Sequence, residues 1–443
     1  MVSADTEEPV ITVGVADRRS EAKGRFNGPC VIKEALSLSG LFHARAAASG
    51  IELFDEGGQL VAASPSIRLT AREGSTFTIF GVTIGVRFHW EREEDQTFQG
   101  NLLLAARGDG TMAIINEVPV EEYLVSVISS EMSGRAPGEF LKAHAIMSRS
   151  WLMAALGQKG SPGATVTSGQ GPGELIRWYN REDHDIFDVC ADDHCQRYQG
   201  ITKIISGEAE RAVRETRGLV LFYGDSVCDA RYYKACGGLT ENYETAWEDI
   251  HIPYLVSVTD WPEAHSPVTS EEEAASWILS SPDAYCNTRD TALLSDVLPG
   301  FDRETTNFFR WKVEYPRGEL EDIIRQRSGM DLGSLVDLTP LERGPSGRIC
   351  RLRISGTKGS IIIGKELEIR RWLSSSHLYS SAFVVSKVGP PGGLPERFIL
   401  NGAGWGHGVG LCQIGAAVMA TRGFTAPRIL EHYFRGARIE RMY

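Results

Sequence analysis

One carboxylate in the segment 114–151 continues an apolar helical stripe. Leu124, Val127 and Ile128 recur at helical spacing, and the position seven residues after Leu124 is Glu131. A carboxyl group on such a face is partly removed from water, which favours its neutral form. A neutral carboxyl can donate a proton to a substrate and later take one back. The pattern therefore predicts a general acid and base at Glu131.

The next stretch of the chain offers two cations to the same region. Pro137 opens a second predicted helix, in which Lys142 and Arg149 are seven residues apart and share a face. We expect both side chains to face one cleft and to bind substrate beside Glu131. The alternative is that Glu131 is a helix-end carboxylate paired with one of these two cations.

Four potential metal ligands, His184, Cys190, His194 and Cys195, lie close together in the sequence. Imidazole and thiolate are the ligands that tetrahedral Zn²⁺ prefers, and the spacing suits a loop wrapped around one ion. The spacing is not that of a standard zinc finger. A disulfide between Cys190 and Cys195, or two unlinked thiols, is the alternative.

The C-terminal part carries alternating glycines from 402 to 410, which allow a backbone to pass close to a ligand. His407 lies within this run and Gln413 follows one helical turn later, so we predict that both face substrate, although a single histidine is more often structural. Cys236 precedes two glycines. We predict a structural or substrate-lining role for it, because no histidine lies at a spacing that suggests a partner for a nucleophile.

Composition limits the class of protein. The 443 residues carry a net charge of -12 with a pI near 5.4, which argues against a nucleic-acid partner. No run of 18 apolar residues is present, and the first residues have neither a basic nor an apolar leader region, so no export signal is visible. The eight cysteines are spread through a long chain, which does not indicate a disulfide framework.

The order of predicted elements indicates an α+β protein. Several short runs within residues 9–118 alternate apolar and polar side chains. We predict that residues 1–100 form a β-rich region packed on a mixed core, which comprises residues 101–265 and 396–443. Residues 266–395 read as an inserted α+β subdomain. A long loop rich in Gly, Pro and Ser is expected over 157–174, a helix over 203–216 and a strand at YLVSV, residues 254–258.

At these motifs the chain resembles the SpoIID family, the stage II sporulation protein D and its LytB-like amidase-enhancer relatives. The resemblance rests on VPVEEYLVSVISSEM, LKAHAIMSRSW, ACGGLTEN and GWGHGVGLCQIGAAVMA, which stand in the family's order. It implies a lytic transglycosylase of peptidoglycan glycan strands, with Glu131 as the catalytic glutamate and Lys142 at the family's lysine. Many relatives carry serine where this chain has Cys236 and Cys412.

The resemblance also implies that His184, Cys190 and Cys195 form a zinc-binding loop, with His194 as an outer or alternative ligand. We expect this zinc to be structural, because a lytic reaction needs no metal-bound hydroxide. The substrate lies outside the cell membrane, so we expect a location in the cell envelope or periplasm, with a signal that has been removed or that lies upstream.

One glutamate suffices for a lytic reaction, because the muramic acid's own C6 hydroxyl acts as the nucleophile and leaves a 1,6-anhydro end. A hydrolase needs two carboxylates, and Glu241 or Glu244 could supply the second. A third possibility is a non-catalytic module that grips glycan and stimulates an N-acetylmuramoyl-L-alanine amidase.

Overall fold

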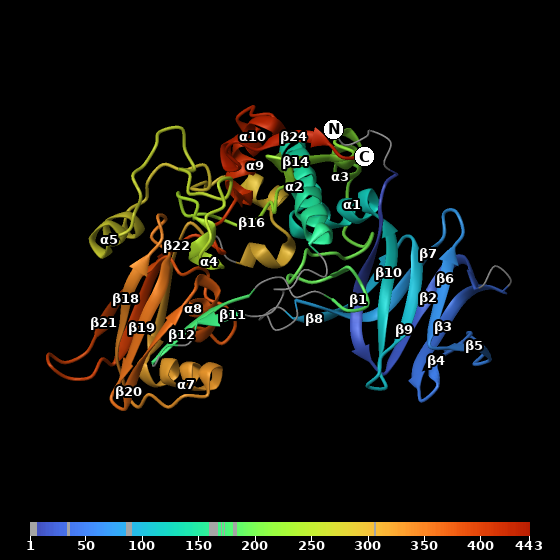
Figure 1. Cartoon of the computed structure of the whole chain (residues 1–443), viewed down its shortest axis with the longest axis horizontal. Helices are drawn as coiled ribbons and strands as arrows, with labels where there is room; N and C mark the ends of the chain where they lie inside the picture. Colours follow the sequence, from blue (N-terminus) through green and yellow to red (C-terminus); the bar gives the residue numbers. More distant parts are fainter. Residues whose placement is uncertain are drawn as a thin grey trace.

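The structure, a computed structural model, describes residues 7–32, 36–85, 91–158, 167–169, 171, 173–179, 184–304 and 307–443. Mixed sheets and helices confirm the predicted α+β class. A large N-terminal sheet forms one side of the molecule, smaller sheets form the other, and α1, α2, α9 and α10 lie between and above them (Figure 1). Among the described helices, none combines the length and the apolar character that crossing a membrane requires.

The largest sheet within these residues has eleven strands, in the order β13-β1-β10-β9-β6-β2-β3-β4-β5, with β7 paired to β2 and to β8. Asp109 and Gly110 form the predicted hairpin turn between β9 and β10. The predicted domain boundary at residue 101 falls inside this sheet, between β8 and β9. The strands are β1 (Val10–Arg19), β2 (Glu21–Ile32), β3 (Leu36–Ala47), β4 (Gly50–Phe54), β5 (Leu60–Ser64), β6 (Ser66–Ala71), β7 (Thr76–Ile84), β8 (Arg92–Phe98), β9 (Asn101–Ala106), β10 (Met112–Pro119) and β13 (Val189–Cys190).

Strand β10 leads directly into α1 (Val120–Glu131), whose N-cap is Pro119. Glu121 and Glu122 lie in the first turn, where the helix dipole favours negative charge. The helix ends at Glu131, earlier than the predicted end near Gly134, because Met132 already has an extended backbone. The carboxylate of interest is therefore the last helical residue.

The long helix α2 (Gly138–Gly157) begins after Pro137 and is buried along most of its length. It packs against α1, against the strand β14 and against three further helices, which explains its apolar character on all sides. The predicted helix over 203–216 is the shorter α3. The partners of α2 are α3 (Glu208–Glu215), α9 (Gln413–Thr421), α10 (Ala426–Tyr433) and β14 (Leu219–Tyr223).

The other side of the molecule is built from small sheets and short helices. Strand β14 pairs with β15 and β24, and β16 pairs with β23; β17, β22 and β21 form one sheet, and β11, β12, β20, β19 and β18 form another. Their bounds are β11 (Thr167–Gly169), β12 (Glu174–Trp178), β15 (Ser226–Val227), β16 (Tyr232–Tyr233), β17 (Arg310–Pro316), β18 (Leu335–Arg343), β19 (Ile349–Gly356), β20 (Gly359–Gly364), β21 (Phe383–Val388), β22 (Arg397–Ala403), β23 (Leu411–Cys412) and β24 (Arg438–Arg441). The helices are α4 (Tyr243–Ala246), α5 (Glu271–Leu279), α6 (Thr291–Val297), η1 (Gly300–Glu304), α7 (Arg317–Ser328) and α8 (Glu366–Trp372).

Buried apolar side chains form two large clusters. One joins the N-terminal sheet to α1, α2, α9 and α10 and also contains residues from 284 to 309. The other gathers residues from 311 to 400. We propose that the inserted unit is centred on this second cluster, while residues 284–309 pack with the main core and α5 packs against β21 and β22.

One sequence prediction lies partly outside the described residues, and another is wrong. Part of the loop expected over 157–174 lies outside the described residues, while β11 and the start of β12 fall within its described part. The strand predicted at YLVSV is wrong. Residues 254–258 form a loop, in which Leu255 and Val258 are buried and accept hydrogen bonds from Tyr243 N and Thr240 N. The apolar side chains of this run are buried by packing within a loop rather than by pairing in a β-sheet.

One buried ion pair joins α1 to α2. The guanidinium of Arg149 is fully buried and donates to both carboxylate oxygens of Glu121, at 3.0 and 2.6 Å, and to the Leu219 carbonyl at 2.9 Å. Glu121 also accepts from the Tyr443 hydroxyl at 2.7 Å. This pair ties both helices to β14 and the C-terminus.

We predict that Arg149→Met lowers the free energy of unfolding by about 3–5 kcal/mol, because it leaves a largely buried carboxylate without its cation. Lys142→Met is the matched control on the same helix, since Lys142 forms partly exposed pairs with Glu139 and Glu215. Its loss should cost no more than about 1 kcal/mol. Urea unfolding measures both, and equal losses would contradict this assignment.

Candidate functional site

Glu131 lies at the C-terminal end of α1 with only 9% of its surface exposed. Its Oε1 accepts a hydrogen bond from the Tyr232 hydroxyl at 2.9 Å and another from the Arg197 backbone N–H at 3.0 Å. Tyr232 belongs to β16, and Arg197 follows the His/Cys loop. Three segments far apart in the sequence therefore hold one carboxyl group in a fixed position.

Burial raises the pKa of Glu131, because the charged form loses hydration in the interior. The positive charge of Arg197 opposes this shift, and the negative charge of Asp193 adds to it. The net direction is upward, so the neutral acid is favoured to a higher pH than in an exposed glutamate. This agrees with the electrostatics expected of a proton donor.

One buried ion pair and one partly buried ion pair lie beside this carboxyl group. The Lys234 ammonium lies 2.8 Å from the Asp302 carboxylate and donates to the Glu131 backbone carbonyl at 3.1 Å. Arg197 pairs with Asp193, and its guanidinium lies 3.7 Å from Asp302. The two cations are thus tied to carboxylates other than Glu131, which leaves the Glu131 side chain without a direct ion pair among the recorded contacts.

Sequence reasoning missed Tyr232, Lys234, Arg197 and Asp302. The sequence does mark the first two as candidates, because Tyr232 and Lys234 are two residues apart, as on one face of a strand, just before the glycine pair at 237–238. Nothing in the local pattern marks Arg197 or Asp302, because only the fold brings them to α1.

The two cations predicted to share a cleft with Glu131 have other recorded partners. Lys142 pairs with Glu139 at 3.0 Å and Glu215 at 2.7 Å. Arg149 is held by Glu121. The alternative in which Glu131 pairs with Lys142 or Arg149 is wrong, since the contacts of Glu131 go to Tyr232 and Arg197.

A buried layer connects the C-terminal motif to Tyr232. The Gln413 amide lies 3.2 Å from the His144 Nε2, and the His144 ring packs edge-on against Tyr232 with centroids 5.3 Å apart. Burial lowers the pKa of His144 to about 3, so this imidazole is neutral. Gln413 is therefore linked to Glu131 by three successive contacts, through His144 and Tyr232, and it supports Tyr232.

The remaining predicted binding residues lie elsewhere. His407 is partly buried and accepts from the Val409 N–H at 3.1 Å, and its ring packs edge-on against Tyr233 and Trp247. Cys236 is buried, and its sulfur lies 3.3 Å from that of Cys286. A substrate contact does not follow from this interior position of Cys236.

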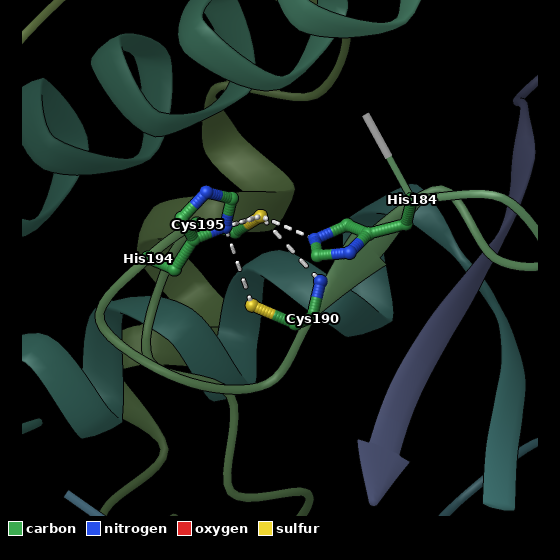
Figure 2. Close-up of side chains that lie close together, drawn as sticks. All are labelled: His184, Cys190, His194 and Cys195. Atoms are coloured by element: carbon green, nitrogen blue, oxygen red, sulfur yellow. Dashed lines mark hydrogen bonds between the residues drawn. The ribbon is translucent and has the colours of Figure 1, made fainter. Parts of the chain in front are cut away.

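The four predicted metal-ligand candidates do come together. One ligand atom from each of His184, Cys190, His194 and Cys195 lies within 4.8 Å of the others (Figure 2). The Cys195 sulfur is 3.3 Å from His184 Nε2 and 3.4 Å from His194 Nδ1, and the Cys190 sulfur is 3.8 Å from His194 Nδ1. In a tetrahedral zinc site, ligand bonds of about 2.0–2.3 Å place neighbouring nitrogen and sulfur atoms about 3.5 Å apart.

These distances fit a Cys₂His₂ metal site, and both cysteines are free thiols. His194 takes a full place among the four, whereas the resemblance assigned it an outer or alternative position. The spacing in sequence could not settle this, because the turn at 191–194 determines where its ring points.

The loop is anchored on two sides. Strand β13 pairs in parallel with β1, through Val13 with Val189 and Gly14 with Cys190. Beyond Cys195 the chain reaches Arg197, whose N–H donates to Glu131. A hollow of about 410 Å³ lies between this loop and the N-terminal sheet and is lined in part by Arg19, Gln96 and Arg197. The metal-ligand loop thus connects the sheet to the carboxyl group.

The carboxylates considered for a hydrolase are otherwise engaged. Glu241 is fully buried and bonds to Thr245 and Ser346. Glu244 accepts from the Asn242 amide at 3.0 Å. Asp193 and Asp302 lie nearer to Glu131, but each is paired with a cation.

Comparison with known proteins follows this geometry. The family described as Stage II sporulation protein matches residues 108–223, which contain Glu131, α2 and the His/Cys loop. A second family, described as Domain of unknown function (DUF8618), matches residues 241–410.

Individual relatives agree with the first match. Stage II sporulation protein D of Bacillus amyloliquefaciens is 25% identical over 336 residues, covering 73% of this chain and 75% of the relative. The amidase enhancer of Bacillus subtilis (strain 168) is 23% identical over 246 residues, covering 52% of this chain and 32% of the relative. An uncharacterized protein of Brachyspira hyodysenteriae is 25% identical over 344 residues, with 77% and 72% covered.

The predicted resemblance to the SpoIID family is confirmed, and it is carried by residues 108–223. Within that matched segment, Glu131 is the buried carboxyl group at the end of α1.

The raised pKa of Glu131 predicts a pH-dependent effect of Glu131→Gln on stability. A folded-state pKa above the unfolded value gives stability that is fully present below the unfolded pKa and is lost as pH rises through the folded pKa. From about pH 4 upward, wild type should therefore lose stability relative to Glu131→Gln, by up to about 1.4 kcal/mol per pH unit in this window. Denaturant unfolding at several pH values measures the difference.

Glu139→Gln is the control of opposite sign. Burial tends to raise the pKa of Glu139, but hydrogen bonds from the Ala426 N–H and Lys142 outweigh it and lower the pKa. Wild type should gain stability relative to this variant as pH rises through the acid range. A flat difference for Glu131→Gln would contradict the buried, neutral acid.

Proposed function

We propose that this protein is a peptidoglycan lytic transglycosylase that cleaves between MurNAc and GlcNAc, with Glu131 as general acid and then base. The observation that supports it best is a buried carboxyl group with a raised pKa, held at Oε1 by Tyr232 and the Arg197 N–H. A role in peptidoglycan metabolism agrees with the relatives that the chain resembles.

The reaction divides into two proton transfers. Glu131 gives its proton to the glycosidic oxygen, the bond between the MurNAc C1 and that oxygen breaks, and GlcNAc leaves as an alcohol. The MurNAc C6 hydroxyl attacks C1, and its proton passes to the Glu131 carboxylate. The acid is regenerated, and the MurNAc end carries a 1,6-anhydro ring.

The hydrogen bonds of the Glu131 carboxyl group suggest different roles for its two oxygens. Both recorded hydrogen bonds end on Oε1. These donors stabilise a carboxylate oxygen, so we assign Oε2 as the atom that carries and delivers the proton. Lys234 and Arg197 offset the negative charge that appears after proton transfer, and their own carboxylate partners prevent them from removing the proton beforehand.

The predicted binding residues then have two roles. Lys142 and His407 are partly exposed, and they remain candidates for contact with glycan. Arg149, Cys236 and Gln413 are buried, so we propose that they position helices and strands around Glu131 without touching substrate.

His184, Cys190, His194 and Cys195 would hold a zinc ion, which would supply structural cross-linking and no reacting group. The site would position the catalytic region through the backbone, because the N–H of Arg197, two residues after Cys195, donates to Glu131. The envelope or periplasm is the expected location, because the glycan substrate lies there.

A second candidate is a glycan-binding amidase enhancer without catalysis. One relative is named amidase enhancer, and a peptidoglycan amidase is the partner that this name suggests. A buried carboxyl with raised pKa has no role in simple glycan binding, which favours the enzyme.

Glu131→Gln keeps the shape and hydrogen bonding of the side chain but cannot supply a proton. We predict that it folds, binds glycan strands and releases anhydro-ended fragments at least about 10²-fold more slowly, as expected for the loss of a general acid. Chromatography of digested glycan measures the rate. Glu122→Gln, an exposed position on the same helix, should leave the rate unchanged.

If Glu131→Gln keeps more than about a tenth of the wild-type rate, another group is the acid. If wild type itself binds glycan, stimulates an amidase and cuts nothing, the enhancer proposal replaces this one.

We predict that the double variant Cys190→Ser with Cys195→Ser contains about one zinc per chain less than wild type, because two of four ligands are gone. Elemental analysis of protein purified without chelators gives both contents. Cys350→Ser, a buried thiol outside the cluster, is the control. Equal zinc in wild type and the double variant would rule out a metal at this loop.

A further inference from the structure

A second group of potential metal ligands lies apart from the His/Cys loop. Cys236, Asp260, Cys286 and Cys412 are all buried, and one ligand atom from each lies within 4.8 Å of the others. They come from four separate segments: the turn after β16, the segment before α5, the segment between α5 and α6, and β23 at the start of α9. No local sequence motif contains them.

The geometry has the dimensions of a small metal cage. The sulfur atoms of Cys236 and Cys286 are 3.3 Å apart. Sulfur ligands of a tetrahedral zinc ion, each about 2.3 Å from the metal, lie about 3.8 Å from one another. Small side-chain rotations therefore suffice for the four atoms to surround one ion.

Backbone amides already point at these ligand atoms. The Cys236 sulfur accepts from Gly238 N–H at 3.2 Å, and the Cys412 sulfur accepts from Cys236 N–H at 3.3 Å and Gly415 N–H at 3.4 Å. Asp260 accepts from Cys286 N–H at 2.8 Å. Donors of this kind favour thiolates and carboxylates, the forms that bind metal.

The Gly238 and Gly415 amides can approach because these residues are glycines in crowded positions. Gly238 has a φ of +111°, and a Cβ at Gly415 would lie 2.4 Å from an Asp260 oxygen. The backbone thus brings amide donors close to the ligand atoms. Side chains that serve only as core packing would not need such donors.

One positively charged side chain already lies next to the cluster. Arg310 borders the cluster through the Gly237 carbonyl, 2.9 Å away, and one guanidinium balances one negative charge.

We propose that Cys236, Asp260, Cys286 and Cys412 form a second metal site, which binds zinc or another thiolate-preferring divalent cation in a closed, structural Cys₃Asp set. The four protein ligands leave no open position for substrate or water. The site is distinct from the Cys₂His₂ loop and shares no ligand with it.

The position of this site gives it a consequence for the proposed catalysis. Cys412 lies in β23, and Cys236 follows β16, which pairs with β23 through Tyr233 and Cys412. The Lys234 carbonyl accepts from Ile414 N–H at 3.1 Å, while its ammonium contacts Glu131 and Asp302. A metal here would hold the segment 232–236, which contains Tyr232 and Lys234.

A disulfide between Cys236 and Cys286 is the competing chemistry. Their sulfurs would need to approach from 3.3 Å to about 2.05 Å. That bond would leave Cys412, with its two amide donors, and Asp260 unexplained. The metal site accounts for all four groups.

The test uses the full chain without its first site. In the Cys190→Ser, Cys195→Ser background we expect about one zinc per chain to remain, and cobalt exchanged into it should show the intense near-ultraviolet absorption of thiolate-to-cobalt charge transfer. Adding Cys412→Ser should remove this metal. Adding Cys30→Ser, a buried thiol of the N-terminal sheet, should leave it in place.

The cobalt spectrum needs no substitution within the Cys₃Asp set, so a folding defect in Cys412→Ser does not affect it. If the background variant misfolds, the zinc content of wild type is measured instead, and we expect two zinc ions per chain. A content of one zinc ion per chain would overturn the proposal. A folded background variant that binds neither zinc nor cobalt would also overturn it. So would mass spectrometry that finds Cys236 joined to Cys286 in unreduced protein.

Discussion

The burial of one carboxyl group at the end of α1 is the constraint on which the site depends. An ionised side chain there would lose most of its hydration, so the fold surrounds Glu131 with a hydroxyl and a backbone amide and ties the nearby cations to other carboxylates. The result is a carboxyl group that keeps its proton to a higher pH than an exposed glutamate, near charges that stabilise the carboxylate formed when the proton leaves. Catalysis by a single residue requires that combination.

This arrangement needs precise support from distant parts of the chain. Tyr232 lies on β16, which pairs with β23 just before α9, and Lys234 directly follows this strand. Arg197 follows the loop that β13 attaches to the N-terminal sheet. Two groups of cysteines lie beside these two supports. Cross-links at both places would hold the two segments that donate to Oε1, through Tyr232 and through the Arg197 N–H.

Local pattern was enough to predict the α+β class, the helix that ends near Glu131 and the histidines and cysteines of one loop, because periodicity and ligand type are local properties. It failed where tertiary contacts decide. YLVSV looked like a strand, but loop packing buries it; Lys142 and Arg149 share a helix face, yet other carboxylates hold them. Asp260, Cys286 and Cys412 meet Cys236 only in the folded chain.

The chemistry of the cut ends tests the central claim most directly. Glycan strands would be digested with wild-type protein in heavy-oxygen water, and the products analysed by mass spectrometry. A lytic transglycosylase leaves 1,6-anhydro MurNAc ends that contain no solvent oxygen, since the C6 hydroxyl is the nucleophile. Reducing ends that carry heavy oxygen would show that water attacks C1, and Glu131 would then be one of two carboxylates in a hydrolase.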